Sequence, residues 1–275
     1  MLRRFDLYAS LEEKMNIVVL IKQVPEIELV KIDQAANDIV LPSGPGVVNP
    51  FDEFAVEEAL RLKEKHGGKV TVMTVAAQKG ESALRDCLAL GVNEAILISD
   101  PTFEKSDPQA TAKILAAGLK KIGPCDLILS GKQAIDDDSA QVPGAVAGFL
   151  GLPQVMFVKK IETVDGDKMT VWRTTEEGYD VVEVSLPAVL SVVKEINEPR
   201  LPSLRGKMMA KKAAITKWTA ADIGIETTSV GANSYTKTVK ISPPPPRQKG
   251  EFITGETPQE IAEKLFNKLK ENQLL

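Results

Sequence analysis

The sequence predicts a Rossmann-like three-layer α/β fold, in which helices cover both faces of a mostly parallel sheet, with antiparallel edge strands and an extended C-terminal arm. Three observations favour this fold. Apolar strand-like segments alternate with amphipathic helices up to residue 150, strand-like segments follow one another directly after residue 152, and proline and basic residues accumulate after residue 195. We therefore expect an N-terminal extension over residues 1–14, an α/β domain over residues 15–195 and an arm over residues 196–275.

The composition is that of a globular chain with no strong charge bias. Its 275 residues are 43% hydrophobic and 26% charged, so it can bury one substantial core or two small ones and is not membrane-spanning. The net charge of -4 gives no overall attraction to nucleic acid, so we expect no nucleic-acid partner. Cys87 and Cys125 form no CxxC pair, which argues against disulfides or a zinc site and favours a reducing cytoplasm.

The chain begins with an extension, a strand and a capped helix. Residues 1–14 contain no continuous apolar stretch and do not resemble a secretion signal. Residues 16–21 form the first predicted strand, and a short hairpin strand is predicted at residues 38–41 in the loop-rich segment after it. Asn49 then caps a helix that has Pro50 at its first position. Apolar residues recur at helical spacing along one face of it: Phe51, Ala55, Ala59 and Leu62.

The alternation of helix and strand continues to residue 150. Further strands are predicted at residues 69–75, 95–98 and 126–130. Further helices are predicted at residues 82–90, 108–122 and from about 139 to 150. Four strands with intervening helices imply right-handed crossovers and a parallel sheet.

The pattern changes after residue 152. Strand-like segments at residues 170–173, 181–184 and 188–193 are separated by short turns, which suggests antiparallel additions near the sheet edge. Successive prolines force residues 241–247 to be extended, and residues 258–270 form a final amphipathic helix. Such an arm gains stability by lying on another surface, either a partner subunit or its own domain.

A polar bend after the fourth strand is the strongest candidate for a binding site. The buried strand at residues 127–129 ends in a glycine bend and a polar segment, residues 131–142, that we call the elbow. Ligands of open α/β sheets bind at the carboxyl ends of the strands, and a helix N-terminus attracts anions. The elbow therefore predicts a seat for a nucleotide phosphate.

The acidic side chains of the elbow limit how a phosphate can lie there. Asp136, Asp137 and Asp138 would repel a phosphate next to their carboxylates, so we expect them to cap amides, bind ribose hydroxyls or face solvent. Three consecutive residues do not converge easily on one octahedral ion, so we expect no metal site.

Other catalytic signatures are missing from the sequence. No GxGxxG follows the first strand and no GxxxxGK[ST] occurs, which excludes the common dinucleotide and P-loop fingerprints. His66 ends a charged helix just before two glycines, and the serines and cysteines have no credible histidine partner, so we expect no catalytic residue. Residues 197–212 combine leucines with positive charge and form either a protein-docking loop or a solvated basic loop.

These segments together resemble the β subunit of the electron transfer flavoproteins, from about Met15 to the C-terminus. The motifs that carry the resemblance lie at residues 49–59, 131–138 and 197–200. The resemblance implies an adenine nucleotide-binding domain that holds AMP as a structural group, and an α subunit that holds most of a redox-active FAD. It also implies that the heterodimer carries electrons from dehydrogenases such as acyl-CoA dehydrogenases to a membrane quinone oxidoreductase.

The resemblance assigns residues to two sites. Those around the nucleotide would be Leu20, Asn49, Pro50, Phe51, Asp52, Val75, Gly131, Lys132, Gln133, Ala134, Ile135, Asp136, Asp137, Asp138, Ser139, Ala140, Gln141 and Val142. Leu204 matches the apolar anchor of a docking loop that enters a pocket on dehydrogenases. Positive charge beside it would come from Arg205, Lys207, Lys211 and Lys212.

Two alternatives remain open at the level of sequence. Some family members hold a second FAD in place of AMP, oxidise NADH and split its electrons between two acceptors. Residues 136–138 are typical of AMP-binding members, whereas residues 140–142 are typical of the bifurcating ones, and Pro143 and Thr174 depart from the AMP type. A stand-alone adenine nucleotide-binding regulator on the same sheet is the alternative from another functional class.

Overall fold

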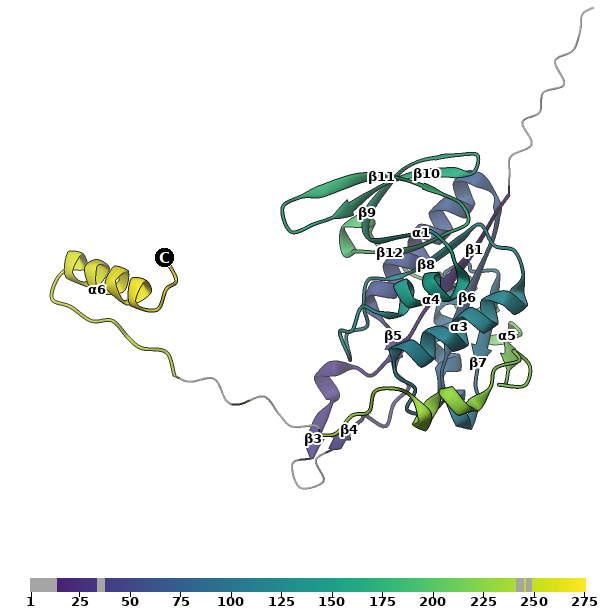
Figure 1. Cartoon of the computed structure of the whole chain (residues 1–275), viewed down its shortest axis with the longest axis horizontal. Helices are drawn as coiled ribbons and strands as arrows, with labels where there is room; N and C mark the ends of the chain where they lie inside the picture. Colours follow the sequence, from purple (N-terminus) through teal and green to yellow (C-terminus); the bar gives the residue numbers. More distant parts are fainter. Residues whose placement is uncertain (1–13, 34–37, 241–244, 246–248) are drawn as a thin grey trace, which may run out of the picture.

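A nine-stranded sheet forms the centre of the protein (Figure 1). The computed structural model describes residues 14–33, 38–240, 245 and 249–275. The strand order is β11-β10-β9-β12-β8-β1-β6-β7-β13. The strands are β1 (Met15–Leu20), β6 (Gly68–Val75), β7 (Glu94–Ile98), β8 (Leu127–Gly131), β9 (Gln154–Asp165), β10 (Lys168–Thr174), β11 (Tyr179–Ser185), β12 (Ala188–Val192) and β13 (Thr216–Trp218). All pairings from β9 to β13 through β12, β8, β1, β6 and β7 are parallel, which confirms the predicted fold class.

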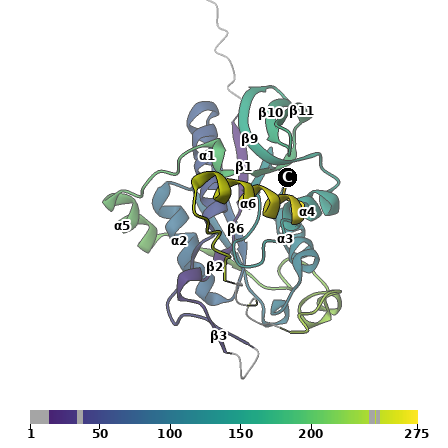
Figure 2. The ribbon, with the colours of Figure 1, turned by 90° about the vertical axis from the view of Figure 1, so that its left-hand side faces the viewer.

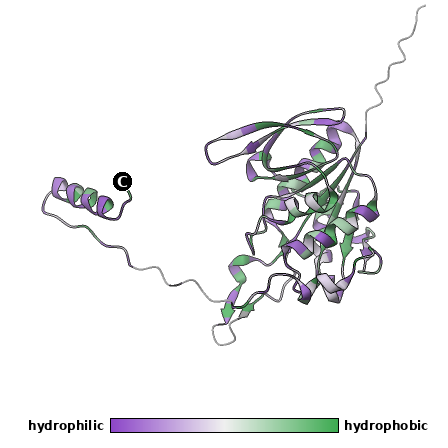
Figure 3. Ribbon diagram, in the orientation of Figure 1, coloured by the Kyte–Doolittle hydropathy of each residue, from purple (hydrophilic) through white to green (hydrophobic). Residues whose placement is uncertain are grey.

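Helices cover both faces of this sheet, as Figure 2 shows. The helices are α1 (Pro50–His66), α2 (Glu81–Leu90), α3 (Pro108–Ile122), α4 (Val142–Leu150), α5 (Leu204–Lys212) and α6 (Pro258–Glu271). Alternate residues of β1 point to opposite faces, so Ile17 packs in one apolar core with α1 and α2, and Val18 packs in the other with α3 and α4. The apolar residues concentrate along the sheet between these helices (Figure 3).

Shorter elements complete the chain. Two small antiparallel pairs join β2 (Gln23–Val24) to β5 (Val47–Val48) and β3 (Lys31–Asp33) to β4 (Asp38–Val40). The second pair confirms the hairpin strand predicted at residues 38–41. Single 3-10 turns lie at Ile27–Leu29, Gln78–Gly80, Pro101–Phe103, Lys194–Ile196, Thr227–Ser229 and Gly231–Asn233.

The predicted antiparallel additions are only partly correct. Strand β9 was not predicted, and it pairs antiparallel with β10, which pairs antiparallel with β11. Strand β12 is not an edge addition, because it lies between β8 and β9 and is parallel to both. All five of its residues are buried, which is typical of an interior parallel strand.

The helix after the elbow begins later than predicted. We expected it from about Ser139, but α4 begins at Val142. Asp138 and Ala140 have φ angles of 51° and 53°, in the left-handed region, and this conformation cannot be part of a right-handed helix.

The C-terminal region is partly integrated into the body of the protein. Strand β13 pairs with β7 and so extends the main sheet, while the domain boundary at residue 195 stays a prediction. The predicted final helix is confirmed as α6, which has no buried residue and lies away from the sheet in Figure 1. The extended segment predicted at residues 241–247 lies outside the described residues except at Pro245. No helix of the described chain is long and apolar enough to cross a membrane.

Candidate functional site

A cavity of about 570 Å³ lies at the carboxyl ends of β1, β6, β7 and β8. This is the position at which open α/β sheets bind ligands. Twelve of the residues predicted to surround a nucleotide line it: Leu20, Asn49, Asp52, Val75, Gly131, Gln133, Ala134, Asp137, Ser139, Ala140, Gln141 and Val142. Segments far apart in the sequence therefore meet at one edge of the sheet.

The other six predicted residues do not line the cavity. These are Pro50, Phe51, Lys132, Ile135, Asp136 and Asp138. Lys132 places its ammonium group 4.9 Å from the ring centre of Phe51, and its backbone N–H donates to the carbonyl of Val192. Asp138 accepts a hydrogen bond from the side chain of Gln133. These contacts stabilise the elbow and its junction with α1.

Sequence reasoning missed the other residues that line the cavity. They are Ile21, Lys22, Ala76, Ala77, Gln78, Ser99, Asp100, Pro101, Phe103, Glu104, Lys105, Ser106, Pro108, Thr111, Leu115, Ser130 and Pro143. Most of these residues directly follow the carboxyl ends of β1, β6 and β7 or begin α3. The rule that predicted the elbow after β8 would have found them if applied to every strand.

Asn49 binds the backbone of the elbow. Its side chain is 1% exposed and makes no capping bond to α1, although Asn49 does precede the helix as predicted. Its Nδ2 donates to the carbonyl of Gln133 at 2.8 Å, and its Oδ1 accepts from the N–H of Ile135 at 3.2 Å. Asn49 therefore fixes the path of the elbow through main-chain atoms.

Asp52 joins the ends of two neighbouring strands. Its carboxylate is 5% exposed and accepts from the N–H of Lys22 at 2.7 Å and from the N–H of Gly131 at 3.0 Å. Burial raises the pKa of Asp52 to about 7, and these two hydrogen bonds offset part of that rise. A Cβ on Gly131 would lie 2.5 Å from the carbonyl carbon of Phe51, so only glycine fits this contact.

Two of the three aspartates of the elbow form ion pairs with one lysine. Lys22 places its Nζ 2.7 Å from Oδ1 of Asp136 and 3.2 Å from Oδ2 of Asp137. Asp137 also accepts from the N–H of Ser139 at 3.1 Å. Burial would raise the pKa of Asp137, but the hydrogen bonds from Ser139 and Lys22 outweigh it and hold the pKa below its ordinary value. The repulsion expected for a phosphate is therefore reduced by a lysine that the sequence argument overlooked.

Backbone donors without an acceptor belong to residues at the start of α4 that line this cavity. Within the described chain, the N–H groups of Ala140, Gln141 and Val142 have no protein acceptor, and all three residues line the cavity. Unpaired amides at a helix N-terminus carry partial positive charge and bind anions. The arrangement can therefore hold a phosphate close to an apolar wall that contains Leu20, Val75 and Leu115.

The predicted docking residues lie elsewhere, on α5. The segment is a helix, not a loop, because Ser203 caps its first turn through a bond from the N–H of Gly206 at 3.0 Å. Leu204 is 78% exposed, and Met208 and Met209 are also exposed. The same helix carries Arg205, Lys207, Lys211 and Lys212. None of these residues lines the cavity.

Comparison with known proteins places the chain in a family. The model of the electron transfer flavoprotein domain matches residues 39–223. A caffeyl-CoA reductase-Etf complex subunit, CarD, from Acetobacterium woodii is 42% identical over 95% of this chain and 100% of its own length. The electron transfer flavoprotein subunit beta of Thermoanaerobacterium thermosaccharolyticum is 42% identical over 91% of this chain and 98% of its own length. Protein FixA from Azotobacter vinelandii is 38% identical over 93% and 94%.

The family model covers more than half of the chain, and the relatives are similar along almost their whole length. Membership implies a partner subunit of the same flavoprotein type. The chain therefore belongs to the β subunits of the electron transfer flavoproteins, a family of electron carriers.

Proposed function

We propose that the chain holds AMP in its cavity as a structural group, while a partner α subunit carries the redox-active FAD. The heterodimer then takes electrons from dehydrogenases such as acyl-CoA dehydrogenases, in the cytoplasm, and passes them to an acceptor such as a membrane quinone oxidoreductase. The cavity with three unpaired N–H groups at its wall is the observation that carries this proposal. Family membership supports the role of the partner.

In this proposal the residues of the chain bind and position the nucleotide and do no chemistry themselves. The N–H groups of residues 140–142 hold the phosphate, and the apolar wall receives the adenine ring. Asn49 and Asp52 keep the elbow in place because their side chains are committed to backbone groups. A ligand that binds only the folded chain stabilises it, so AMP would stabilise the sheet edge that forms the cavity.

The oxidoreductase that exchanges electrons with the heterodimer is proposed to act on CoA thioesters. One relative at 42% identity is named as a subunit of a caffeyl-CoA reductase complex, and the similarity spans the whole of that relative. The exposed leucine and methionines of α5, surrounded by lysine and arginine, suit a partner with an apolar pocket and an acidic rim.

The size of the cavity favours a second candidate. The cavity continues past the elbow along residues 99–106 and the start of α3, where a mononucleotide phosphate at α4 would leave space. A second FAD would use that space, and the chain would then belong to a bifurcating complex that oxidises NADH. The exposed faces of α5 and α6 disfavour the third alternative, a stand-alone regulator, because they are apolar surfaces that a monomer would leave uncovered.

The nucleotide content of the heterodimer tests the proposal. The chain is co-expressed with its α subunit, the complex is purified and denatured in acid, and the released nucleotides are quantified by mass spectrometry. One AMP and one FAD per heterodimer are expected. Two FAD molecules without AMP would establish the second candidate, and a complex with no adenine nucleotide beyond the α-subunit FAD would contradict both.

A pair of matched asparagines sharpens this experiment. Asn49→Ala removes two hydrogen bonds to the elbow and is expected to lower nucleotide retention. Asn93 makes comparable contacts at the opposite edge of the sheet, where its Oδ1 accepts from the N–H of Val70 at 3.0 Å and from Lys63 at 3.1 Å. Asn93 is exposed, so Asn93→Ala is expected to lower stability by less than Asn49→Ala and to leave the nucleotide content unchanged.

A further inference from the structure

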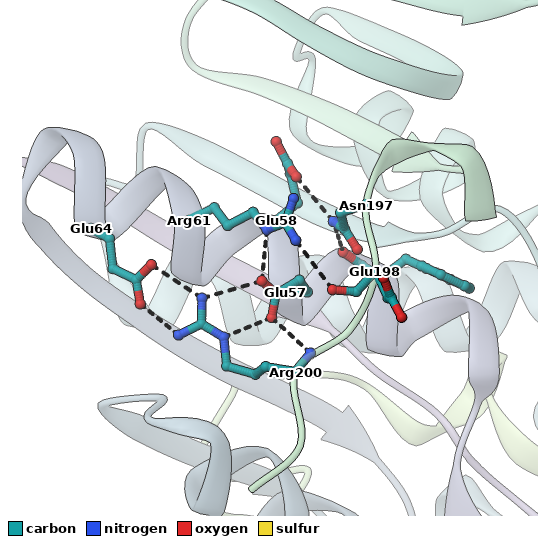
Figure 4. Close-up of polar contacts among 8 residues, drawn as sticks. Glu57, Glu58, Arg61, Glu64, Asn197, Glu198 and Arg200 are labelled. Carbon is teal, nitrogen blue, oxygen red and sulfur yellow. Dashed lines mark hydrogen bonds and ion pairs between the residues drawn. The ribbon is translucent and has the colours of Figure 1, made fainter.

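The segment that leads into α5 is fastened to α1 by polar contacts (Figure 4). The side chain of Asn197 donates to the carbonyl of Phe54 and to Oε2 of Glu58, both at 3.0 Å. Arg61 reaches from α1 in the other direction and donates to the carbonyl of Glu198 at 3.2 Å. Helix α1 therefore holds the chain just before the docking helix.

Arg200 makes several hydrogen bonds to carboxylates of α1. Its Nε lies 2.7 Å from Oε2 of Glu57, its Nη2 lies 3.2 Å from Oε1, and its backbone N–H donates to Oε2 at 3.2 Å. Its Nη2 also donates to Glu64 at 3.1 Å. Such a planar fork on two carboxylates fixes the direction of the chain as well as its position.

The carboxylate at the centre of this cluster is buried and charged. The side chain of Glu57 is 4% exposed and is shared by Arg200 and Arg61, the latter at 2.7 Å. Burial would raise the pKa of Glu57, but the hydrogen bonds from Arg200 and Arg61 outweigh it and lower the pKa. A buried carboxylate that loses one of two guanidinium partners is strongly disfavoured, so the cluster tolerates little movement.

The far end of α5 is held by a second arginine. Arg85 of α2 donates through Nη1 to the carbonyls of Ala210, Lys211 and Ala213 at 2.7, 3.2 and 3.3 Å. The last carbonyls of a helix lack intrahelical partners, and of these three, within the described chain, only that of Ala210 also accepts from a backbone N–H, that of Ala213 at 3.3 Å. In between, a Cβ on Gly206 would lie 2.2 Å from the carbonyl oxygen of Ala89, so α5 lies directly on the backbone of α2.

We propose that Arg200 is a positioning residue that fixes the start of the docking helix on α1, so that Leu204 is presented to the dehydrogenase in one orientation. A nine-residue helix is not stable alone, and the leucine itself is too exposed to set its own orientation. Contacts on α1 and α2 supply this order before the partner arrives, which lowers the entropy lost on docking. The role of Leu204 rests on the proposed function, whereas the fixing of the helix does not.

Amide hydrogen exchange on the heterodimer tests the positioning directly. In Arg200→Gln, the amides of residues 201–212 are expected to exchange about tenfold faster or more, because the front anchor is lost. Arg200→Lys keeps the charge without the planar fork and is expected to restore part of the protection. Arg173→Gln is the matched control, because Arg173 pairs with Asp180 at 2.9 Å on the antiparallel strands. Unchanged exchange of residues 201–212 in a folded Arg200→Gln heterodimer would overturn the proposal.

Kinetics with a recombinant acyl-CoA dehydrogenase separate positioning from docking. If both inferences hold, Arg200→Gln raises the KM for the heterodimer about tenfold, leaves kcat and nucleotide content unchanged, and Arg200→Lys restores part of the KM. Faster exchange of residues 201–212 with an unchanged KM would support the positioning role and contradict docking through α5. A lower kcat or a loss of nucleotide would instead assign Arg200 to general folding and overturn the proposal.

Discussion

The elbow and the docking helix are both polar segments next to the main sheet, yet their side chains are used in opposite ways. In the elbow, Asp136 and Asp137 are engaged by Lys22, and Asn49 holds the main chain, so mostly backbone groups remain for a ligand. In α5, the backbone is held from behind, and Leu204 projects into solvent. An enclosed seat with fixed donors suits a group that stays bound, whereas an exposed anchor on a fixed helix suits a partner that must leave quickly.

The largest expected effect on stability is at the close contact between Gly131 and the backbone of Phe51. Gly131→Ala would place a Cβ against backbone atoms of Phe51, which cannot move aside as a side chain can. We expect the free energy of unfolding to fall by about 3 kcal/mol or more, measured by urea denaturation of the heterodimer. Gly148→Ala in α4 is the matched control, because no atom lies within 4 Å of its added Cβ. A mild effect of Gly131→Ala would show that the elbow is more adaptable than its contacts indicate.

The next effect is on partner binding and not on stability. Leu204→Ala removes most of an exposed side chain, so the unfolding free energy is expected to change by about 0.5 kcal/mol or less. Full burial of a leucine in a partner is worth about 1.5 to 3 kcal/mol, so the KM for the heterodimer in a dehydrogenase assay is expected to rise by about tenfold or more. Leu201 is 91% exposed and serves as the control. A larger effect of Leu201→Ala would mean that the anchor is a different side chain.

A pH-dependent effect is expected from Asp52. Because burial raises its pKa to about 7, the folded protein keeps the Asp52 proton in a pH range where the unfolded chain has lost it. Its contribution to stability is therefore greatest below about pH 4, declines as the pH rises towards 7, and is constant above that. Unfolding of the heterodimer with native Asp52 and with Asp52→Asn between about pH 5 and 8 isolates this contribution. A stability difference that shifts in favour of the native residue with rising pH would contradict it.

The smallest expected effect is at the ion pairs of Lys22. Both pairs are partly exposed, so Lys22→Gln is expected to cost about 0.2 to 1 kcal/mol at low salt and less at high salt. Lys69 forms a comparable exposed pair with Glu94 at 3.1 Å on the opposite edge of the sheet. Nucleotide retention measured against salt should change in Lys22→Gln and not in Lys69→Gln. Equal retention in both variants would remove Lys22 from the support of the elbow.

Much of the fold follows from local sequence patterns. Helix α1 begins at a proline that directly follows Asn49, and helix α3 begins at a proline that directly follows Asp107. Proline after such a residue is a strong start signal, so both starts were predictable. Strand β9 was missed because its twelve residues mix exposed and buried positions without clean alternation. The interior place of β12 depends on its pairing with β8 and β9, and pairing partners are a property of the tertiary structure that a local pattern does not contain.

The site was partly predictable for a related reason. Gly131 and the polar residues after it are a local signal, and the structure places many of them at the cavity. The commitment of Asn49 to Gln133 and Ile135 depends on contacts across more than eighty residues of sequence, which no local pattern reveals. Nor does the sequence show the left-handed backbone of Asp138 and Ala140, because such conformations in non-glycine residues are imposed by their surroundings.

The hydrogen bonds of Asn49 have a consequence for how this bend tolerates substitution. They end on the carbonyl of Gln133 and the N–H of Ile135, groups that every amino acid except proline supplies. Mutations can therefore exchange the side chains of the bend while its course through space is inherited intact. Single substitutions in the bend can therefore change which ligand the cavity prefers without changing the backbone that forms it. New ligand specificities can evolve at this bend one residue at a time.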